Sequence, residues 1–181
     1  QHDLSLKHQD WLIKNFKNVE AHTLNLDKLF ESFENSLSKF NNNHGMANSR
    51  ARLRMTTLYQ VASANKGIVV GTGNKVEDFG VGFYTKYGDG GVDISPIADC
   101  NKTEVWEMGT DMNILKEIID AAPTDGLWDD GRTDEGQLGL KYSELEEAMN
   151  NQDSQNREKY EKIRKLNLHK IEPIPVCKIP N

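Results

Sequence analysis

The sequence has few of the features that mark membrane-spanning or disulfide-bonded proteins. It contains no apolar run near the ~20 residues that a membrane-spanning helix requires. Residues 1–18 are too polar and too mixed in charge for a secretory signal peptide. Cys100 and Cys177 are the only cysteines, and neither lies in a metal-ligand spacing. We therefore expect no disulfide framework, no membrane association and a reduced, cytoplasmic setting.

Positive charge and apolar residues are also scarce. The net charge is −6, and 36% of the residues are hydrophobic. This charge disfavours nucleic-acid binding through bulk electrostatics, so we expect no nucleic-acid partner. It still permits binding of nucleotides, which need only a few basic side chains; the candidates are Arg50, Arg52, Arg54, Lys86 and Lys102. The length predicts a single domain over residues 1–181 with a modest core.

Helical and strand-like patterns alternate along the chain. Helical periodicity predicts helices over residues 4–16, 29–40, 47–65, 102–108, 112–121, 142–149 and 156–166. Strands are expected over residues 19–27, 67–71 and 92–97. The inward face of the helix over 47–65 is predicted to consist of Leu53, Thr57, Leu58, Val61 and Ala62. This alternation predicts an α/β fold with a parallel sheet.

The segment GTGNKVEDFGVGFYTKYGDGGVDIS, residues 71–95, contains the most informative pattern. It follows Ile68-Val69-Val70, a short apolar run that predicts a buried parallel strand. Each glycine raises the entropy cost of ordering the backbone, so this many glycines are unusual in a packed element. A glycine-rich loop after such a strand suits the binding of a phosphate or a sugar.

Two further segments have distinctive compositions. Residues 123–138 are rich in glycine and acidic residues and poor in apolar ones, which predicts a mobile lid. The prolines in residues 171–181 predict an extended tail.

Several motifs together resemble the ammonia-dependent NAD synthetases, which belong to the ATP pyrophosphatases. The resemblance rests on GTGNKVEDFGVGFYTKYGDGG (71–91), NSRARLRM (48–55), APTDGLW (122–128), DGRTDEGQLGLKYSELEEAM (130–149) and Leu168-His169-Lys170. It implies an open, mostly parallel Rossmann-like sheet flanked by helices, as in the adenine nucleotide alpha hydrolases. The family's N-terminal Ser-Gly-Gly-x-Asp-Ser phosphate loop does not occur here. We therefore expect the C-terminal part of a synthetase, with a sheet that is incomplete at the N-terminus.

The resemblance implies a reaction in which ammonia amidates deamido-NAD through an acyl-adenylate, giving NAD, AMP and pyrophosphate. ATP would be the co-substrate and Mg²⁺ the cofactor, and the protein would be a homodimer. Two alternatives stay open. The chain could be the synthetase part of a glutamine-dependent NAD synthetase, or a truncated and catalytically inactive chain that binds nucleotide. We expect the chain to be inactive on its own.

The resemblance also assigns an ATP site. It makes Thr72 and Thr124 ATP contacts, Glu77 a magnesium ligand, and Lys102 a contact of the ATP phosphates, with Glu77 and Lys102 as the catalytic pair. From the residues alone, Thr72 could instead cap a helix and Glu77 could favour the N-terminus of that helix. Lys102 opposes the dipole of the helix that it begins, and such a local conflict often marks a functional position.

A second set of residues is implied for the deamido-NAD site. It consists of Asn48, Arg52, Tyr59, Lys86, Asp89, Asp93, Gln137, His169 and Lys170. Asn48, Arg52 and Tyr59 share one face of a predicted helix, where surface ion pairing is the alternative interpretation. A glycine turn with a solvated lysine is the alternative for residues 84–91, as is a solvated tail for His169 and Lys170. The family often has an acidic residue at the position of Gln137.

Overall fold

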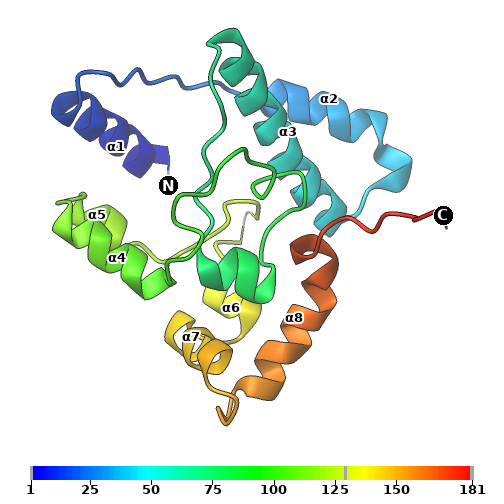
Figure 1. The fold of residues 1–181 in the computed structure, drawn as a ribbon. Helices are drawn as coiled ribbons and strands as arrows, with labels where there is room; N and C mark the ends of the chain where they lie inside the picture. Colours follow the sequence, from blue (N-terminus) through cyan, green and yellow to red (C-terminus); the bar gives the residue numbers. More distant parts are fainter. Residues whose placement is uncertain (1, 129, 180–181) are drawn as a thin grey trace.

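The computed structural model describes residues 2–128 and 130–179, and Figure 1 shows helices arranged around a centre of irregular loops. The helical elements, in chain order, are α1 (His2–Asn15), α2 (Asp27–Ser36), η1 (Ser38–Phe40), α3 (Asn43–Ala64), η2 (Lys75–Val81), α4 (Lys102–Asp111), α5 (Lys116–Ile119), α6 (Asp134–Leu138), α7 (Tyr142–Asn150) and α8 (Arg157–Ile171). None of the helices in the described residues is long and apolar enough to cross a membrane.

Strand pairing is limited to one place in the described residues. Val70 and Ile94 form an isolated parallel bridge, flanked by hydrogen bonds from Gly71 N to Ile94 O (2.7 Å) and from Asp93 N to Val69 O (3.0 Å). The bridge lies where the sequence predicts neighbouring parallel strands, but the expected sheet is not confirmed. Ladder hydrogen bonds need a partner along the whole strand, and each of these segments pairs with the other over this short stretch only.

Other predicted elements differ in extent. The strand expected over residues 19–27 is wrong, because residues 18–26 are irregular and α2 begins at Asp27. The helix expected over 112–121 is limited to α5, whereas the helix expected over 156–166 extends to Ile171 as α8. The predicted lid contains one short helix, α6. Residues 173–179 have no regular structure and are exposed, as the prolines predict.

Helix α3 buries a different face from the predicted one. Its buried residues are Met46, Ala47, Ala51 and Met55, while Leu58 is 51% exposed. The small alanines allow close approach of the glycine-rich loop, since a Cβ atom added at Gly88 would lie 3.0 Å from Cβ of Ala51. The predicted inward face is therefore wrong for Leu58, whereas its other four members, Leu53, Thr57, Val61 and Ala62, are half-buried.

The hydrophobic core joins η2 to α7 and α8. Its members are Val76, Val81, Leu138, Leu140, Tyr142, Leu145, Ala148 and Tyr160. Burying each Val or Leu side chain contributes ~1.5–3 kcal/mol. This core fixes the position of the segment that follows the parallel bridge.

The segment after the bridge is a π-helix, η2, which the sequence patterns do not predict. Its N-cap is Asn74, whose side-chain oxygen accepts from the backbone N–H groups of Val76 and Glu77, both at 3.0 Å. It ends at Gly82, where φ is 67°. The capping role considered for Thr72 therefore belongs to Asn74. Short π-helical turns occur often at functional sites, and this one carries Glu77.

Candidate functional site

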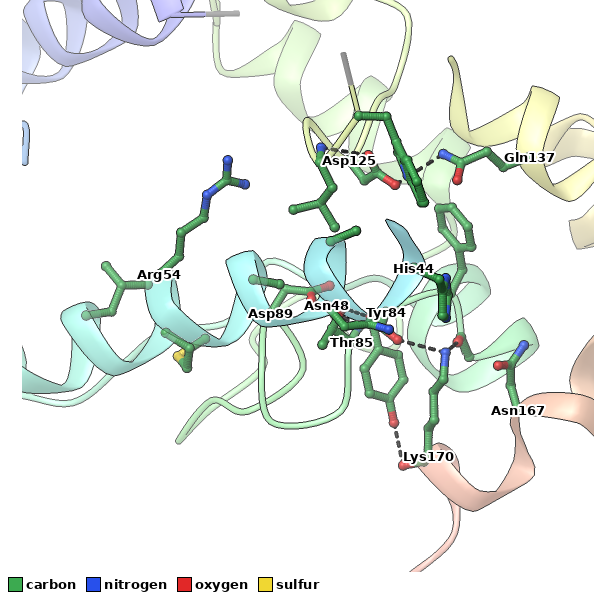
Figure 2. Close-up of a pocket in the computed structure, with 18 residues that line it drawn as sticks. His44, Asn48, Arg54, Tyr84, Thr85, Asp89, Asp125, Gln137, Asn167 and Lys170 are labelled. Atoms are coloured by element: carbon green, nitrogen blue, oxygen red, sulfur yellow. Dashed lines mark hydrogen bonds between the residues drawn. The ribbon is translucent and has the colours of Figure 1, made fainter. Parts of the chain in front are cut away.

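The cavity where family motif residues gather, called here the main cavity, lies between α3, the glycine-rich loop, the loop before α6 and the end of α8. Its volume is about 450 Å³. Figure 2 shows the polar side chains that line it, among them Asn48, Asp89, Gln137 and Lys170. The apolar part of the wall comes from α3, through Ala47, Ala51, Met55 and Leu58. Small-molecule sites commonly combine such an apolar wall with a few polar groups.

Helix α3 holds the glycine-rich loop through side-chain hydrogen bonds. Thr85 Oγ1 donates to Asn48 Oδ1 at 2.7 Å, and Arg52 Nε donates to Lys86 O at 3.1 Å. Within the loop, Asp89 Oδ1 accepts from the backbone N–H of Thr85 at 3.0 Å. Asn48, Arg52, Lys86 and Asp89 therefore meet at one edge of the cavity, although they come from separate sequence motifs.

Tyr59 and Asp93 form a pair of their own. Tyr59 OH donates to Asp93 Oδ1 at 3.1 Å, and Asp93 Oδ2 accepts from the backbone N–H of Val69 at 2.8 Å. Asp93 thus ties α3 to the parallel bridge. Neither side chain lines the main cavity.

The end of α8 closes another side of the cavity. Lys170 Nζ donates to Gly82 O and Tyr84 O, both at 2.8 Å, and Tyr84 OH donates back to Lys170 O. Burial lowers the pKa of the Lys170 ammonium, and the charge of Asp89 opposes that effect. His169 contributes its backbone oxygen, which accepts from Lys86 Nζ. Lys170 is therefore part of the site wall, whereas the side chain of His169 is exposed and only its backbone oxygen holds the edge of the cavity.

The loop at residues 124–128 forms the last side. Arg50 Nη1 donates to Leu127 O at 3.1 Å, and Arg54 Nη2 donates to Gly126 O at 3.2 Å. Gln137 Nε2 donates to Asp125 Oδ2 at 3.1 Å. Partial burial, followed by the charge of Arg50, lowers the pKa of the Arg54 guanidinium. Helices on both sides thus hold this loop.

A separate polar cluster surrounds Glu77. Lys102 Nζ lies 3.0 Å from Glu77 Oε1, and both side chains are largely buried. Tyr142 OH donates to the same Oε1 atom, and Asn74 Nδ2 donates to Oε2. Asp134 Oδ2 lies 3.3 Å from the Tyr142 hydroxyl, and burial together with the charge of Glu77 raises the pKa of Asp134 to about 6.

Metal ligation in this region would depend on few groups. Among residues 2–128 and 130–179, no three or more His, Cys, Asp or Glu side chains gather so that they could hold a metal ion. Mg²⁺ commonly binds through one or two carboxylates together with substrate phosphates and water. Glu77 supplies one such carboxylate, so the oxygen chemistry present fits Mg²⁺ bound together with a polyphosphate.

The predicted site residues therefore divide into groups. Four of them line the cavity: Asn48, Asp89, Gln137 and Lys170. Arg52, Lys86 and His169 hold its edges, whereas Tyr59 and Asp93 lie beyond it. Glu77 and Lys102 form the second cluster. Thr72 is exposed after the bridge and Thr124 is half-buried in the loop before α6, and neither lines the cavity.

Several contacts at the candidate site were not assigned from the sequence. The loop contacts of Arg50 and Arg54 had only their positive charge as a signal. Asp134 and Tyr142 stand inside the motif of residues 130–149, but their convergence on Glu77 depends on tertiary packing. No periodicity could have revealed it.

Comparison with known proteins identifies related sequences. Residues 1–179 match the family described as NAD synthase. The NH(3)-dependent NAD(+) synthetase of Carboxydothermus hydrogenoformans is 40% identical over 142 residues, covering 76% of this chain and 58% of that protein. The corresponding protein of Alkaliphilus oremlandii is 43% identical over 133 residues, covering 73% of this chain and 49% of that protein. The chain thus spans about half the length of the curated relatives that it matches.

Solved structures extend the comparison to the fold. The structure of NMN synthetase from Francisella tularensis has a TM-score of 0.85 and 32% identity, covering 100% of this chain and 74% of that chain. The NH3-dependent NAD synthetase from Campylobacter jejuni, in complex with the nitrate ion, has a TM-score of 0.67 and 20% identity, covering 89% of this chain and 67% of that chain. The second likeness concerns the fold alone.

Proposed function

Because this chain belongs to the NAD synthase family, we propose that it takes part in the ATP-dependent amidation of deamido-NAD by ammonia. The observation that carries the proposal is the gathering of family motif residues around one cavity. Asn48, Asp89, Gln137 and Lys170 come from four separate motifs and line the same space. The relatives' names support a ligase that forms a carbon–nitrogen bond.

The main cavity is the proposed site for deamido-NAD. Asp89 has one carboxylate oxygen on Thr85 N, which leaves the other to accept from a ribose hydroxyl. The cation of Lys170 lies beside the cavity and would attract an anionic group of the ligand. The apolar side of α3 would face the nicotinate ring.

Glu77 and Lys102 are the proposed catalytic residues of the first step. The nicotinate carboxylate attacks the α-phosphorus of ATP, an acyl-phosphate bond forms, and pyrophosphate leaves. Lys102 would stabilise the negative charge that develops on the departing pyrophosphate. Glu77 would hold Mg²⁺, which neutralises phosphate charge when it is bound. We assign ATP contacts to Thr72 and Thr124 on the resemblance alone.

In the second step, ammonia attacks the carbonyl carbon of the acyl-adenylate. The carbon–nitrogen bond forms, AMP leaves with the electron pair of the broken bond, and the nitrogen gives up a proton. An acyl-adenylate hydrolyses if water reaches it, so the site must be covered. The loop at 124–128, inside the proposed lid of residues 123–138, lies where it could cover the cavity.

A second candidate substrate is nicotinate mononucleotide. The specific observation is that the NMN synthetase structure matches 100% of this chain with a TM-score of 0.85. Both candidate substrates carry the nicotinate carboxylate on a ribose phosphate, so the same activation step serves either one. They differ in the adenylate half of the dinucleotide.

The test is pyrophosphate release by the full-length protein with ATP, Mg²⁺ and ammonium, using deamido-NAD or nicotinate mononucleotide as the acid. We expect release with deamido-NAD and transfer of ¹⁵N from labelled ammonium into the amide. Faster turnover of the mononucleotide would favour the second candidate. No release with either acid would contradict the proposal and favour an inactive nucleotide-binding chain.

The assembly, the location and the nitrogen source are proposals of the same kind. We propose a homodimer in the cytoplasm, with free or channelled ammonia as the nitrogen source. Sedimentation of the full-length protein tests the dimer. If glutamine sustains the reaction as well as ammonium does, the chain belongs to a glutamine-dependent synthetase instead.

A further inference from the structure

Tyr142 is the most enclosed large side chain beside the proposed catalytic pair. It stands at the first position of α7 and is 1% exposed. Its ring centroid lies 5.8 Å from that of Trp106 in an edge-to-face arrangement, and Lys102 Nζ lies 5.0 Å from the ring centroid. The ring therefore packs against α4, the helix that carries Lys102, and its rotamer is fixed by that packing.

The hydroxyl of Tyr142 lies between two carboxylates. It donates to Oε1 of Glu77, the same atom that faces Lys102 Nζ at 3.0 Å. On its other side is Asp134 Oδ2, at 3.3 Å. Asp134 is 7% exposed, and its Oδ1 atom is buried without a hydrogen-bond partner. A tyrosine hydroxyl has a single proton to donate, so one acceptor satisfies it. The second carboxylate beside Tyr142 is therefore not needed for the hydrogen bonding of the hydroxyl.

Three elements converge at this point. Glu77 comes from η2, Lys102 from α4 and Tyr142 from α7. A glutamate side chain is flexible, and Lys102 can move with it, so the ion pair alone does not fix where either charge stands. Asn74 Nδ2 donates to Oε2, and a second donor on Oε1 from a rigid ring completes the restriction of the carboxylate to one orientation. It also keeps Oε1 hydrogen-bonded when Lys102 turns toward a phosphate.

We propose that Tyr142 is a positioning residue for the transfer of the adenylyl group: its hydroxyl orients Glu77, and its ring orients Lys102. This inference rests on the proposed function, because it takes Glu77 and Lys102 as the groups that meet the metal and the phosphates. Asp134 stands behind the hydroxyl and restricts its direction. Catalytic groups that are misplaced by about 1 Å can lose ~10²-fold in rate, which sets the size of the expected effect.

The test compares Tyr142→Phe with Tyr160→Phe in the full-length protein. Both tyrosines belong to the same hydrophobic core, and Tyr160 is 3% exposed. The Tyr160 hydroxyl lies near Gly80, so this control removes a buried hydroxyl that no hydrogen bond joins to Glu77. The measurements are kcat, KM for ATP and for the nicotinate substrate, thermal melting, and Mn²⁺ binding in the presence of ATP by electron paramagnetic resonance.

For Tyr142→Phe we expect kcat to fall by ~10- to 100-fold while both KM values change by less than about threefold. Mn²⁺ should bind several-fold more weakly, and the melt should stay cooperative. Tyr160→Phe should keep the kcat and the Mn²⁺ affinity of the unsubstituted protein. If Tyr142→Phe does not fold, Asp134→Asn, which preserves shape, should shift kcat and Mn²⁺ affinity in the same direction by a smaller factor.

Two results would overturn the inference. One is that both phenylalanine variants lower the melting temperature alike and leave kcat and Mn²⁺ affinity unchanged, as a purely structural role predicts. The other is a fall in Mn²⁺ affinity for Tyr160→Phe as large as that for Tyr142→Phe. If the unsubstituted protein releases no pyrophosphate, the proposed function fails, but weaker Mn²⁺ binding by Tyr142→Phe alone would still support the positioning role.

Discussion

Arg54 donates from Nη2 to the backbone oxygen of Gly126 at 3.2 Å, so the helix that lines the cavity also holds the loop that borders it. Arg50, one turn earlier on α3, does the same for Leu127 O and stacks its guanidinium 4.4 Å from the ring centroid of Phe30. The two arginines thus link α2, α3 and the loop at 124–128. Charged side chains that reach backbone atoms therefore help to fix the position of that loop.

Removing one of these arginines tests the loop. In Arg54→Ala we expect faster amide hydrogen exchange at residues 125–128, because the loop loses one of its few attachments. In the unsubstituted protein, ATP should slow exchange across residues 123–138. The control is Lys66→Ala, a substitution of an exposed residue that lies just after the end of α3. Strong protection of residues 123–138 without nucleotide would show that the segment is no lid.

Glu77→Gln should abolish magnesium-dependent pyrophosphate release while the protein stays folded. Glutamine keeps the shape but removes the charge that faces Lys102 and that would bind the metal. The measurements are pyrophosphate release and circular dichroism. Glu161→Gln, which alters only an ion pair with Arg157 within α8, should retain activity. Near-normal release by Glu77→Gln at saturating Mg²⁺ would remove Glu77 from the mechanism.

Lys86→Ala and Asp89→Asn should raise KM for deamido-NAD more than KM for ATP. Asp89 lines the main cavity, and Lys86 holds its edge through the backbone of His169. Steady-state kinetics with each substrate varied in turn provides the comparison. A larger effect on ATP would mean that the two nucleotides occupy the opposite pockets.

Asp134 should make stability depend on pH. Its pKa is raised from 3.8 to about 6 in the folded protein, so the folded state binds more protons than the unfolded state between these values. The free energy of unfolding should therefore fall as the pH rises from about 4 to about 6, and the loss should persist above that range. Asp134→Asn should weaken this dependence and melt at a higher temperature than the unsubstituted protein at about pH 7.5. Unchanged pH dependence in melts of the variant would contradict the assignment.

The residues around the parallel bridge predict self-association. Ile68, Val70 and Ile94 are 58%, 53% and 46% exposed, although Val69 between the first two is buried. Exposed apolar side chains beside unpaired backbone groups attract other chains. We expect residues 1–181 on their own to self-associate and to form no NAD, and Val70→Lys to reduce the association. A monomeric mass, a cooperative melt and NAD formation by these residues alone would refute this.

The sequence predicted most helices because their apolar periodicity is local. The α4 and α7 helices lie where the pattern places them, and the bridge between Val70 and Ile94 joins two of the predicted strands. Residues 19–27 misled the prediction, because a loose alternation in an exposed segment resembles that of a strand. The face of α3 was misjudged in part, since the glycine-rich loop lies against Ala51, and helical periodicity does not reveal a contact between distant segments.

The motifs that resemble the family supply the four predicted site residues that line one cavity, Asn48, Asp89, Gln137 and Lys170. Their binding of deamido-NAD stays a prediction. What could not be predicted are contacts between motifs, such as Tyr142 on Glu77 or Arg54 on Gly126. They depend on how helices pack, and packing leaves no spacing signature in one sequence. The widened turn of η2 was missed for a similar reason, since π-helices have no distinct periodicity over so short a stretch.

The reciprocal bonds between Lys170 and Tyr84 have a practical consequence for protein engineering. Each residue donates to the other's backbone oxygen, so the last turn of α8 is fastened to the glycine-rich loop. Residues 173–179 beyond it are exposed and irregular. A purification tag or fluorophore can therefore be attached after residue 172 without disturbing the cavity, whereas trimming the chain before Lys170 would detach one of its walls.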